Sequence, residues 1–323
     1  MISKHAKMLE ELQIDEDFSF LAISNSIKPE LVDSLTNIAK FGNAKDQAGE
    51  FFMLFSESAV HFIIYAPAKV SIFYTSIQRD QFDEYHIEKR FTKGGDKDGC
   101  MLKLNISDWK QKSRYFENYT QFIMYRMESG IQFIIIAKEP SSTSKEGQIV
   151  STFRFIIPEL TLSSHSQGIM SPAVFWDSMP NSMNIIAVLN FQDALALEEI
   201  INSTFSMKDD KITLYINEDK TFFFSNTPQE FTQDIDIFDA IKVKFPTGER
   251  SDSTLKILDW SPGIQPTQVN FTYNIRHLKA ATNLLSKGAI LKLKLFQEGQ
   301  MILIVERNQG IISHAVIPCE VKL

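Results

Sequence analysis

The segment LNISDWKQKSRYFENYTQFIMYRMESGIQFIIIAK, residues Leu104–Lys138, decides the fold because its pattern recurs 169 residues later in Tyr273–Arg307. Laid over each other without a gap, the two segments align a strand end, a helix face, a hairpin glycine and a core strand. The aligned residues are Asn105-Ile106 with Asn274-Ile275, Trp109-Lys110 with Leu278-Lys279, Gly130 with Gly299, Ile134-Ile135-Ile136 with Leu303-Ile304-Val305, and Lys138 with Arg307. This agreement indicates an internal repeat. Two unrelated domains that share a similar hairpin are the alternative.

The sequence before each of these segments extends the repeat. Hydrophobic residues at helical spacing predict a helix at Ser26–Phe41 in the first half and another at Phe191–Phe205 in the second. Each predicted helix follows a predicted strand and precedes several short strands. Each half therefore has the order strand, helix, several strands, helix, strands. This order predicts an α+β domain with helices on one face of a mostly antiparallel sheet.

Residues 158–183 interrupt this order and are predicted to connect the two domains. They contain Pro158, Pro172 and Pro180, several serines and no clean period. They also contain the hydrophobic pair Phe175 and Trp176, which indicates that part of the stretch packs on a surface. We therefore divide the chain into an N-terminal extension (1–14), an N-terminal domain (15–157), an interdomain connecting loop (158–183) and a C-terminal domain (184–323).

The composition excludes several classes of function. A chain of 323 residues with 44% hydrophobic and 23% charged residues is ordinary for a globular protein of about two domains. A net charge of −7 excludes a globally basic nucleic-acid binder but not a local basic surface, because screening limits the reach of a charge to ~8–10 Å. Two cysteines and six scattered histidines show no metal-ligand spacing. With no nucleotide-binding or nucleophile motif and no long apolar run, we expect no cofactor, no catalysis and no membrane span.

The order of elements, the duplication and the connecting loop resemble the sliding clamps of the PCNA-like superfamily. Within it, the chain is most similar to a subunit of the nine-one-one checkpoint clamp. Leu12–Asp17 followed by Phe18–Phe41, and also Met207–Phe224, resemble its Rad-one subunit. Phe153–Pro158 and Trp176 resemble the Hus-one subunit, which is a close competitor. The likeness covers most of the chain, but it is a pattern of elements without a single-residue signature.

The resemblance implies two tandem clamp domains with antiparallel sheets and two helices each. It implies a nuclear, non-catalytic subunit of a ring trimer, heterotrimeric in the checkpoint clamp, that encircles double-stranded DNA without sequence specificity. The implied partners are two other clamp subunits, a clamp loader, and peptides of repair and checkpoint proteins. The alternative is a clamp-fold scaffold that binds peptides without encircling DNA. A hydrolase on a two-domain β frame is a third class of function, but no residues in the sequence support it.

Clamps bind DNA through helices whose outward faces are basic and contact phosphates. Four basic residues on the two repeated helices are therefore predicted to face DNA: Lys110, Arg114, Arg276 and Lys279. The helix Ser26–Phe41 is neutral, and Phe191–Phe205 is acidic, so whether the latter faces DNA stays open. Ordinary solvated helix faces are the alternative.

Clamps of this superfamily bind peptides beside the connecting loop, so Phe175 and Trp176 are predicted to bind partners. The alternative is that these two residues only fix the loop to its own domain.

Overall fold

The computed structural model describes residues 19–24, 35–36, 50–65, 71–89, 99–113, 115, 121–127, 130–138, 149–160, 172–181, 185–191, 201, 211–216, 222–225, 256–257, 269–282, 290–307 and 311–322. The predicted extension 1–14 lies outside these ranges, as do most of the predicted helices Ser26–Phe41 and Phe191–Phe205. Leu35 and Thr36 of the first helix and Ile201 of the second are described, and they are helical. Within the described ranges, no helix has the length and apolar character that a bilayer crossing requires.

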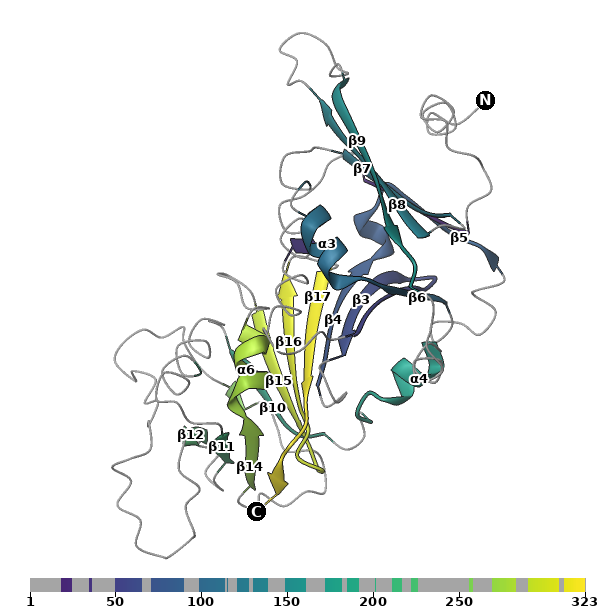
Figure 1. Ribbon diagram of the computed structural model, residues 1–323. Coiled ribbons are helices and arrows are strands. Elements are labelled where there is room, and N and C mark those ends of the chain that lie inside the picture. The colour runs from purple at the N-terminus through teal and green to yellow at the C-terminus, as the bar shows by residue number, and fades with distance from the viewer. Residues whose placement is uncertain are drawn as a thin grey trace, which may run out of the picture.

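A five-stranded antiparallel sheet belongs to the N-terminal half (Figure 1). Its strands, in sheet order, are β5 (Glu84–Ile87), β1 (Phe20–Ser24), β7 (Gln121–Met127), β8 (Gly130–Lys138) and β9 (Ile149–Pro158). The last strand includes Pro158, the first residue that the sequence assigns to the connecting loop.

A nine-stranded sheet runs through both halves of the chain. Its strands, in sheet order, are β13 (Lys256–Ile257), β10 (Ile185–Phe191), β15 (Ile290–Phe296), β16 (Met301–Arg307), β17 (Ile311–Ile317), β4 (Ile72–Gln78), β3 (Ala59–Tyr65), β2 (Glu50–Phe55) and β6 (Cys100–Leu104). The halves meet where β17 pairs antiparallel with β4, and we call this strand pair the interdomain junction. There, Thr75 Oγ1 and Ser313 Oγ are hydrogen-bonded at 2.8 Å.

A third sheet belongs to the C-terminal half and has the order β12 (Phe222–Ser225), β11 (Lys211–Ile216), β14 (Val269–Asn274) and β18 (Val321–Lys322). Three described α-helices accompany the sheets: α3 (Ile106–Ser113), α4 (Pro172–Asp177) and α6 (Ile275–Thr282). A 3₁₀ turn, η2 (Arg79–Gln81), follows β4. In Figure 1, α3 and α6 lie on one side of the nine-stranded sheet and α4 lies on the other.

The predicted repeat is visible in the sheet orders. The order β5-β1-β7-β8-β9 of the first half corresponds, strand for strand along the chain, to β13-β10-β15-β16-β17 of the second. The order β6-β2-β3 corresponds in the same way to β14-β11-β12. Helix α3 follows β6 as α6 follows β14. The predicted fold class, α+β with two tandem domains of antiparallel sheet, is therefore confirmed, while the exact domain boundaries stay a prediction.

The ungapped alignment is wrong by one residue after the hairpin. Gln121 faces Ile136, whereas Ile290, which lies 169 residues after Gln121, faces Glu306, which lies 170 residues after Ile136. The cause is the turn: two residues separate the paired Met127 and Gly130, whereas three separate Phe296 and Gln300, whose backbones are hydrogen-bonded.

A shift of one residue moves every side chain to the other face of a strand. Ile134-Ile135-Ile136 is therefore one residue out of register with Leu303-Ile304-Val305. Phe133 is the equivalent of Leu303, and both belong to the main core.

The main core lies between the helices and the sheets, and Trp109 of α3 is at its centre. Its side chain is fully buried against the rings of Phe51, Phe62 and Phe133, with ring centroids 5.1–5.6 Å apart. Its Nε1 donates a hydrogen bond of 2.9 Å to the carbonyl oxygen of Leu35. This bond connects α3 to Leu35, a helical residue from earlier in the same half of the chain.

Candidate functional site

The two repeated helices begin in the same way. Asn105 Oδ1 accepts hydrogen bonds from the backbone N–H of Ser107 (2.8 Å) and Asp108 (3.3 Å), and it caps α3. Asn274 Oδ1 accepts from the backbone N–H of Arg276 at 2.9 Å and caps α6. An asparagine at this position satisfies backbone donors that have no partner inside the helix. The repeated Asn-Ile pair is therefore a helix-start signal.

The helices bury one face and present the other. On α3, Trp109 and Ser113 are buried, and Lys110 is half-buried. On α6, Ile275, Leu278 and Ala281 are buried, Arg276 is exposed and Lys279 is half-buried. Three predicted residues, Lys110, Arg276 and Lys279, thus lie on the sides of their helices that are not packed in the core. Arg114 lies outside the described residues. Contact of these residues with DNA stays a prediction.

The side chain of Lys112 contacts an aromatic ring on strand β9. Its Nζ lies 5.6 Å from the centroid of the Phe155 ring on β9, so its stem follows the sheet edge. We therefore do not place Lys112 on the candidate DNA face. Helical spacing already places Lys110 and Lys112 on different sides of α3, because residues two apart do not share a helix face. The ring that Lys112 contacts belongs to a distant strand, so that contact could not be predicted from spacing.

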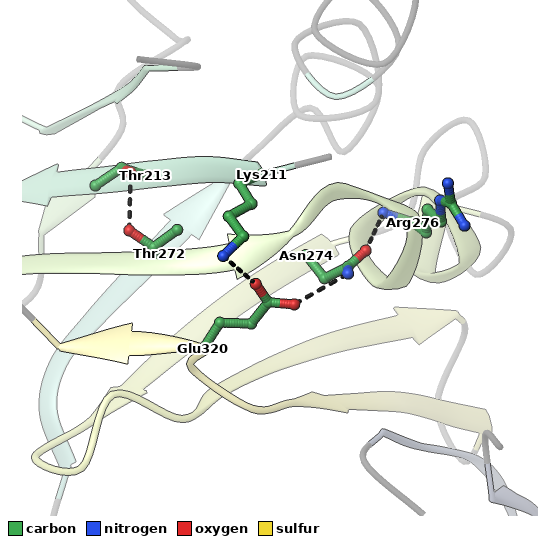
Figure 2. Close-up of polar contacts among 6 residues, drawn as sticks. All are labelled: Lys211, Thr213, Thr272, Asn274, Arg276 and Glu320. Carbon is green, nitrogen blue, oxygen red and sulfur yellow. Dashed lines mark hydrogen bonds and ion pairs between the residues drawn. The ribbon is translucent and has the colours of Figure 1, made fainter. Parts of the chain in front are cut away.

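A polar network stands at the start of α6 (Figure 2). Glu320 Oε1 accepts a hydrogen bond of 3.0 Å from Asn274 Nδ2, and its Oε2 forms an ion pair of 3.2 Å with Lys211 Nζ. The guanidinium of Arg276 points away from Glu320 in this view (Figure 2). Lys211 is a basic residue that the sequence analysis did not select. Its position opposite Asn274 in the β11–β14 register could have revealed it only after the strands were paired.

His277 of α6 contributes no positive charge to this surface at neutral pH. Partial burial lowers the pKa of His277, and the nearby Glu320 opposes this effect. Its Nδ1 lies 2.8 Å from the Ser71 hydroxyl at the start of β4, across the interdomain junction. The imidazole is therefore a structural link between the halves, and the basic character of α6 comes from Arg276 and Lys279.

Helix α4 of the connecting loop packs on the opposite face of the nine-stranded sheet. Phe175 is fully buried, with its ring edge-on to Tyr74 at 5.3 Å between centroids. Trp176 is half-buried and stands edge-on to His61 at 5.2 Å. Val174 points outward and is 42% exposed. The burial of Phe175 favours the alternative that the pair fixes the loop to its own chain, and partner binding by these residues stays a prediction.

Two histidines lie on the α4 side of the sheet, His61 from the first half and His314 from the second; His61 is buried and His314 is half-buried. His61 Nδ1 is 2.7 Å from Ser76 Oγ, and its Nε2 is 3.3 Å from Ser56 Oγ. Burial lowers the pKa of His61 to about 4. His314 stacks on Tyr74 at 4.2 Å, and burial, with smaller contributions from His61 and Lys294, lowers its pKa to about 3. Both imidazoles are neutral at pH 7 and serve as packing groups.

Strand β9 forms an open edge of the five-stranded sheet. Among the strands that the structure describes, it is hydrogen-bonded along its length only to β8. Ile156 is 41% exposed on this strand. The exposed ring of Tyr115 lies 4.3 Å from that of Phe153, centroid to centroid. The edge therefore combines backbone groups that can pair with another strand and a hydrophobic surface beside them.

No family model and no curated protein matches the sequence. Solved structures of sliding clamps do match the fold. The PCNA2-PCNA3 complex from Sulfolobus tokodaii matches with a TM-score of 0.58 and 12% identity, over 93% of this chain and 99% of that chain. Proliferating Cellular Nuclear Antigen from Entamoeba histolytica matches with a TM-score of 0.58 and 12% identity, over 94% of this chain and 100% of that chain.

A third match is A. fulgidus PCNA with the C-terminal region of FEN-1 bound, at a TM-score of 0.56 and 11% identity, over 94% of this chain and 99% of that chain. At such low identity, these matches establish the fold and not the subunit type. The chain has the fold of the PCNA sliding clamps over nearly its whole length.

Proposed function

We propose that this chain is a non-catalytic subunit of a ring-shaped sliding clamp, and that the ring is the heterotrimeric checkpoint clamp of the nucleus. In this role it encloses duplex DNA and serves as a platform for repair and checkpoint proteins. The observation that carries the proposal is the difference between the last strands of the two halves, β17 and β9.

Strand β17 pairs with β4 inside the chain, through a register that runs from Ile311 opposite Ile77 to Val316 opposite Ile72. Strand β9 is the repeat equivalent of β17, yet none of the described strands occupies the corresponding position beside it. A strand equivalent to β4 from the second half of another subunit would complete it in the same way. Such a contact joins different surfaces of two subunits, and a contact of this kind closes into a ring when the rotation permits.

The proposed DNA face consists of the outward sides of α3 and α6. Lys110 and Lys279 occupy equivalent places on the two helices, and Arg276 is exposed beside the cap of α6. Phosphate contacts by such residues are independent of base sequence. A ring holds DNA topologically, so few contacts suffice on a chain whose net charge is −7. The nine-one-one likeness supports a loader and peptide partners, and the FEN-1 region bound to A. fulgidus PCNA supports the peptide partners.

Assembly is tested by light scattering on the chain alone and mixed with candidate clamp subunits. We expect a trimer in one of these mixtures, and we expect Ile156→Asp to prevent it, because a carboxylate would be buried against a neighbouring strand. Leu160→Asp is the matched control, since Leu160 is 36% exposed and lies beyond β9. A trimer that Ile156→Asp leaves intact would exclude β9 as the contact.

DNA enclosure is tested on the assembled ring with closed circular duplex DNA over a range of salt concentrations. We expect glutamate at Lys110, Arg114, Arg276 and Lys279 to abolish retention of the ring. Folding should be preserved, because Arg276 is exposed, Lys110 and Lys279 lie outside the buried faces of their helices, and surface charges contribute little to stability. Each single substitution should lower the salt slope by about 0.9 for each phosphate that its side chain neutralises in the parent. Retention of the fourfold variant equal to that of the parent would favour the alternative, a peptide-binding scaffold that does not use this face for DNA.

A further inference from the structure

The sheet face beneath α4 is a second hydrophobic surface, separate from the main core. Side chains alternate along a strand, so residues next to core residues point to the opposite face. The buried members of this second cluster are Phe52, Leu54, Ile63, Tyr65, Ile72, Tyr74, Met101, Phe175, Phe296, Ile302 and Val316. They come from both halves of the chain. Phe175 of α4 is a member of the cluster, and Trp176 and Met179 pack against it, as do Ile185 and Ile304.

Helix α4 depends on this surface for its order. It has only six residues, Pro172–Asp177, and helices this short do not persist alone in water. Its attachment is concentrated in two adjacent aromatic residues, Phe175 against Tyr74 and Trp176 against His61. The helix ends at Asp177, and the hydroxyl of the next residue, Ser178, donates a hydrogen bond of 2.6 Å to the Phe175 carbonyl.

The fit between α4 and the sheet leaves polar groups unsatisfied. Trp176 Nε1 and His314 Nδ1 are both buried, and neither has a hydrogen-bond partner in the described part of the chain. A buried donor or acceptor without a partner costs free energy that an exposed one does not. The docked position of α4 is therefore less favourable than its hydrophobic contacts alone imply.

We propose that α4 is an internal ligand, which occupies the peptide-docking face of the nine-stranded sheet and must leave before a partner peptide with two adjacent aromatic residues can bind. The proposal rests on the proposed role as a platform for peptides, and it adds that the platform is closed by its own connecting loop. Such competition lowers the apparent affinity for a partner in proportion to the fraction of molecules in which α4 is undocked.

The test uses a fluorescent peptide with the chain's own sequence 172–181, PAVFWDSMPN, added to the full-length chain. We expect it to bind the double variant Phe175→Ala/Trp176→Ala about tenfold or more tightly than the parent, and to raise the melting temperature of that variant. Val174→Ala is the matched control, since it changes an exposed α4 residue, and it should behave as the parent does. A peptide with both aromatic residues replaced by alanine should bind neither protein.

If the double variant does not fold, the single variant Trp176→Ala takes its place in the binding measurement, because this variant keeps the buried Phe175. Equal binding of the peptide to the parent and to a folded variant would overturn the proposal, as would no binding to any folded variant. The measurement needs neither DNA nor other subunits. A failure of ring assembly therefore leaves its outcome unaffected, and the two proposals can fail separately.

Discussion

Replacing His61 with glutamine is expected to flatten the acid side of the stability profile of this protein. His61 lies on β3, only 5% exposed, between Ser56 and Ser76 and under the ring of Trp176. Burial disfavours the charged imidazolium and lowers the pKa of His61 from 6.5 to about 4. The folded protein therefore takes up this proton only near pH 4, whereas the unfolded chain takes it up near pH 6.5.

Between these two values the unfolded chain binds more protons at this site than the folded chain. The stability that His61 contributes is therefore fully present above pH 6.5 and is lost as the pH falls toward 4. The slope is up to ~1.4 kcal/mol per pH unit, and the whole interval amounts to about 3 kcal/mol. Burial lowers the pKa of His314 as well. His314 therefore also lowers the free energy of unfolding as the pH falls, and this loss remains in the His61→Gln variant.

The assay is urea unfolding at a series of pH values from 4 to 7.5 for the parent, His61→Gln and His86→Gln. His86 is an exposed histidine on β5 and serves as the matched control. We expect the free energy of unfolding of His61→Gln to fall less steeply below pH 6.5, while His86→Gln follows the parent. Equal slopes for the parent and His61→Gln between pH 4 and 6.5 would refute the reasoning.

Three further substitutions test the repeated framework by urea unfolding at pH 7.5. Trp109→Phe removes the donor to the buried Leu35 carbonyl and should lower the free energy of unfolding by about 1–3 kcal/mol; an unchanged value would mean that this bond does not stabilise the fold. Gly299→Ala should cost at least ~1–3 kcal/mol, because φ is +85° and the new Cβ would lie 2.7 Å from Cys319 Cβ; full stability would contradict this turn geometry. Asn274→Ala removes the cap of α6 and should cost about 0.5–2 kcal/mol, and a neutral result would argue against capping.

The duplicated framework could be predicted because it leaves local traces in the sequence. The Asn-Ile pairs mark two helix starts, and Trp109 and Leu278 mark the buried faces that follow them. The register after the hairpin could not be predicted in this way. A turn of two residues and a turn of three differ by one position, and an ungapped alignment carries that error into Gly130 and every residue beyond it.

The candidate site could be predicted only in part, for a related physical reason. Lys110 and Lys279 follow from periodicity, because the residue after a buried helix position lies on a different side of the helix. The burial of Phe175 could not be predicted from its neighbours in sequence. Its ring packs against Tyr74 of β4, and the pairing of Tyr74 with His314 of β17 joins residues from opposite halves of the chain.

The interdomain junction and the proposed contact at β9 would be equivalent in strand pairing but not in strength. The junction has further links across it: the Thr75–Ser313 hydrogen bond, the Ser71–His277 hydrogen bond, and α4, which packs on side chains of both halves. A second subunit at β9 would have no connecting loop of its own chain to span the contact. A clamp must open to admit DNA, and the weaker of two equivalent contacts opens at the lower cost in free energy. Under the proposed function, the ring therefore opens between subunits at β9, while the β4–β17 pair stays closed.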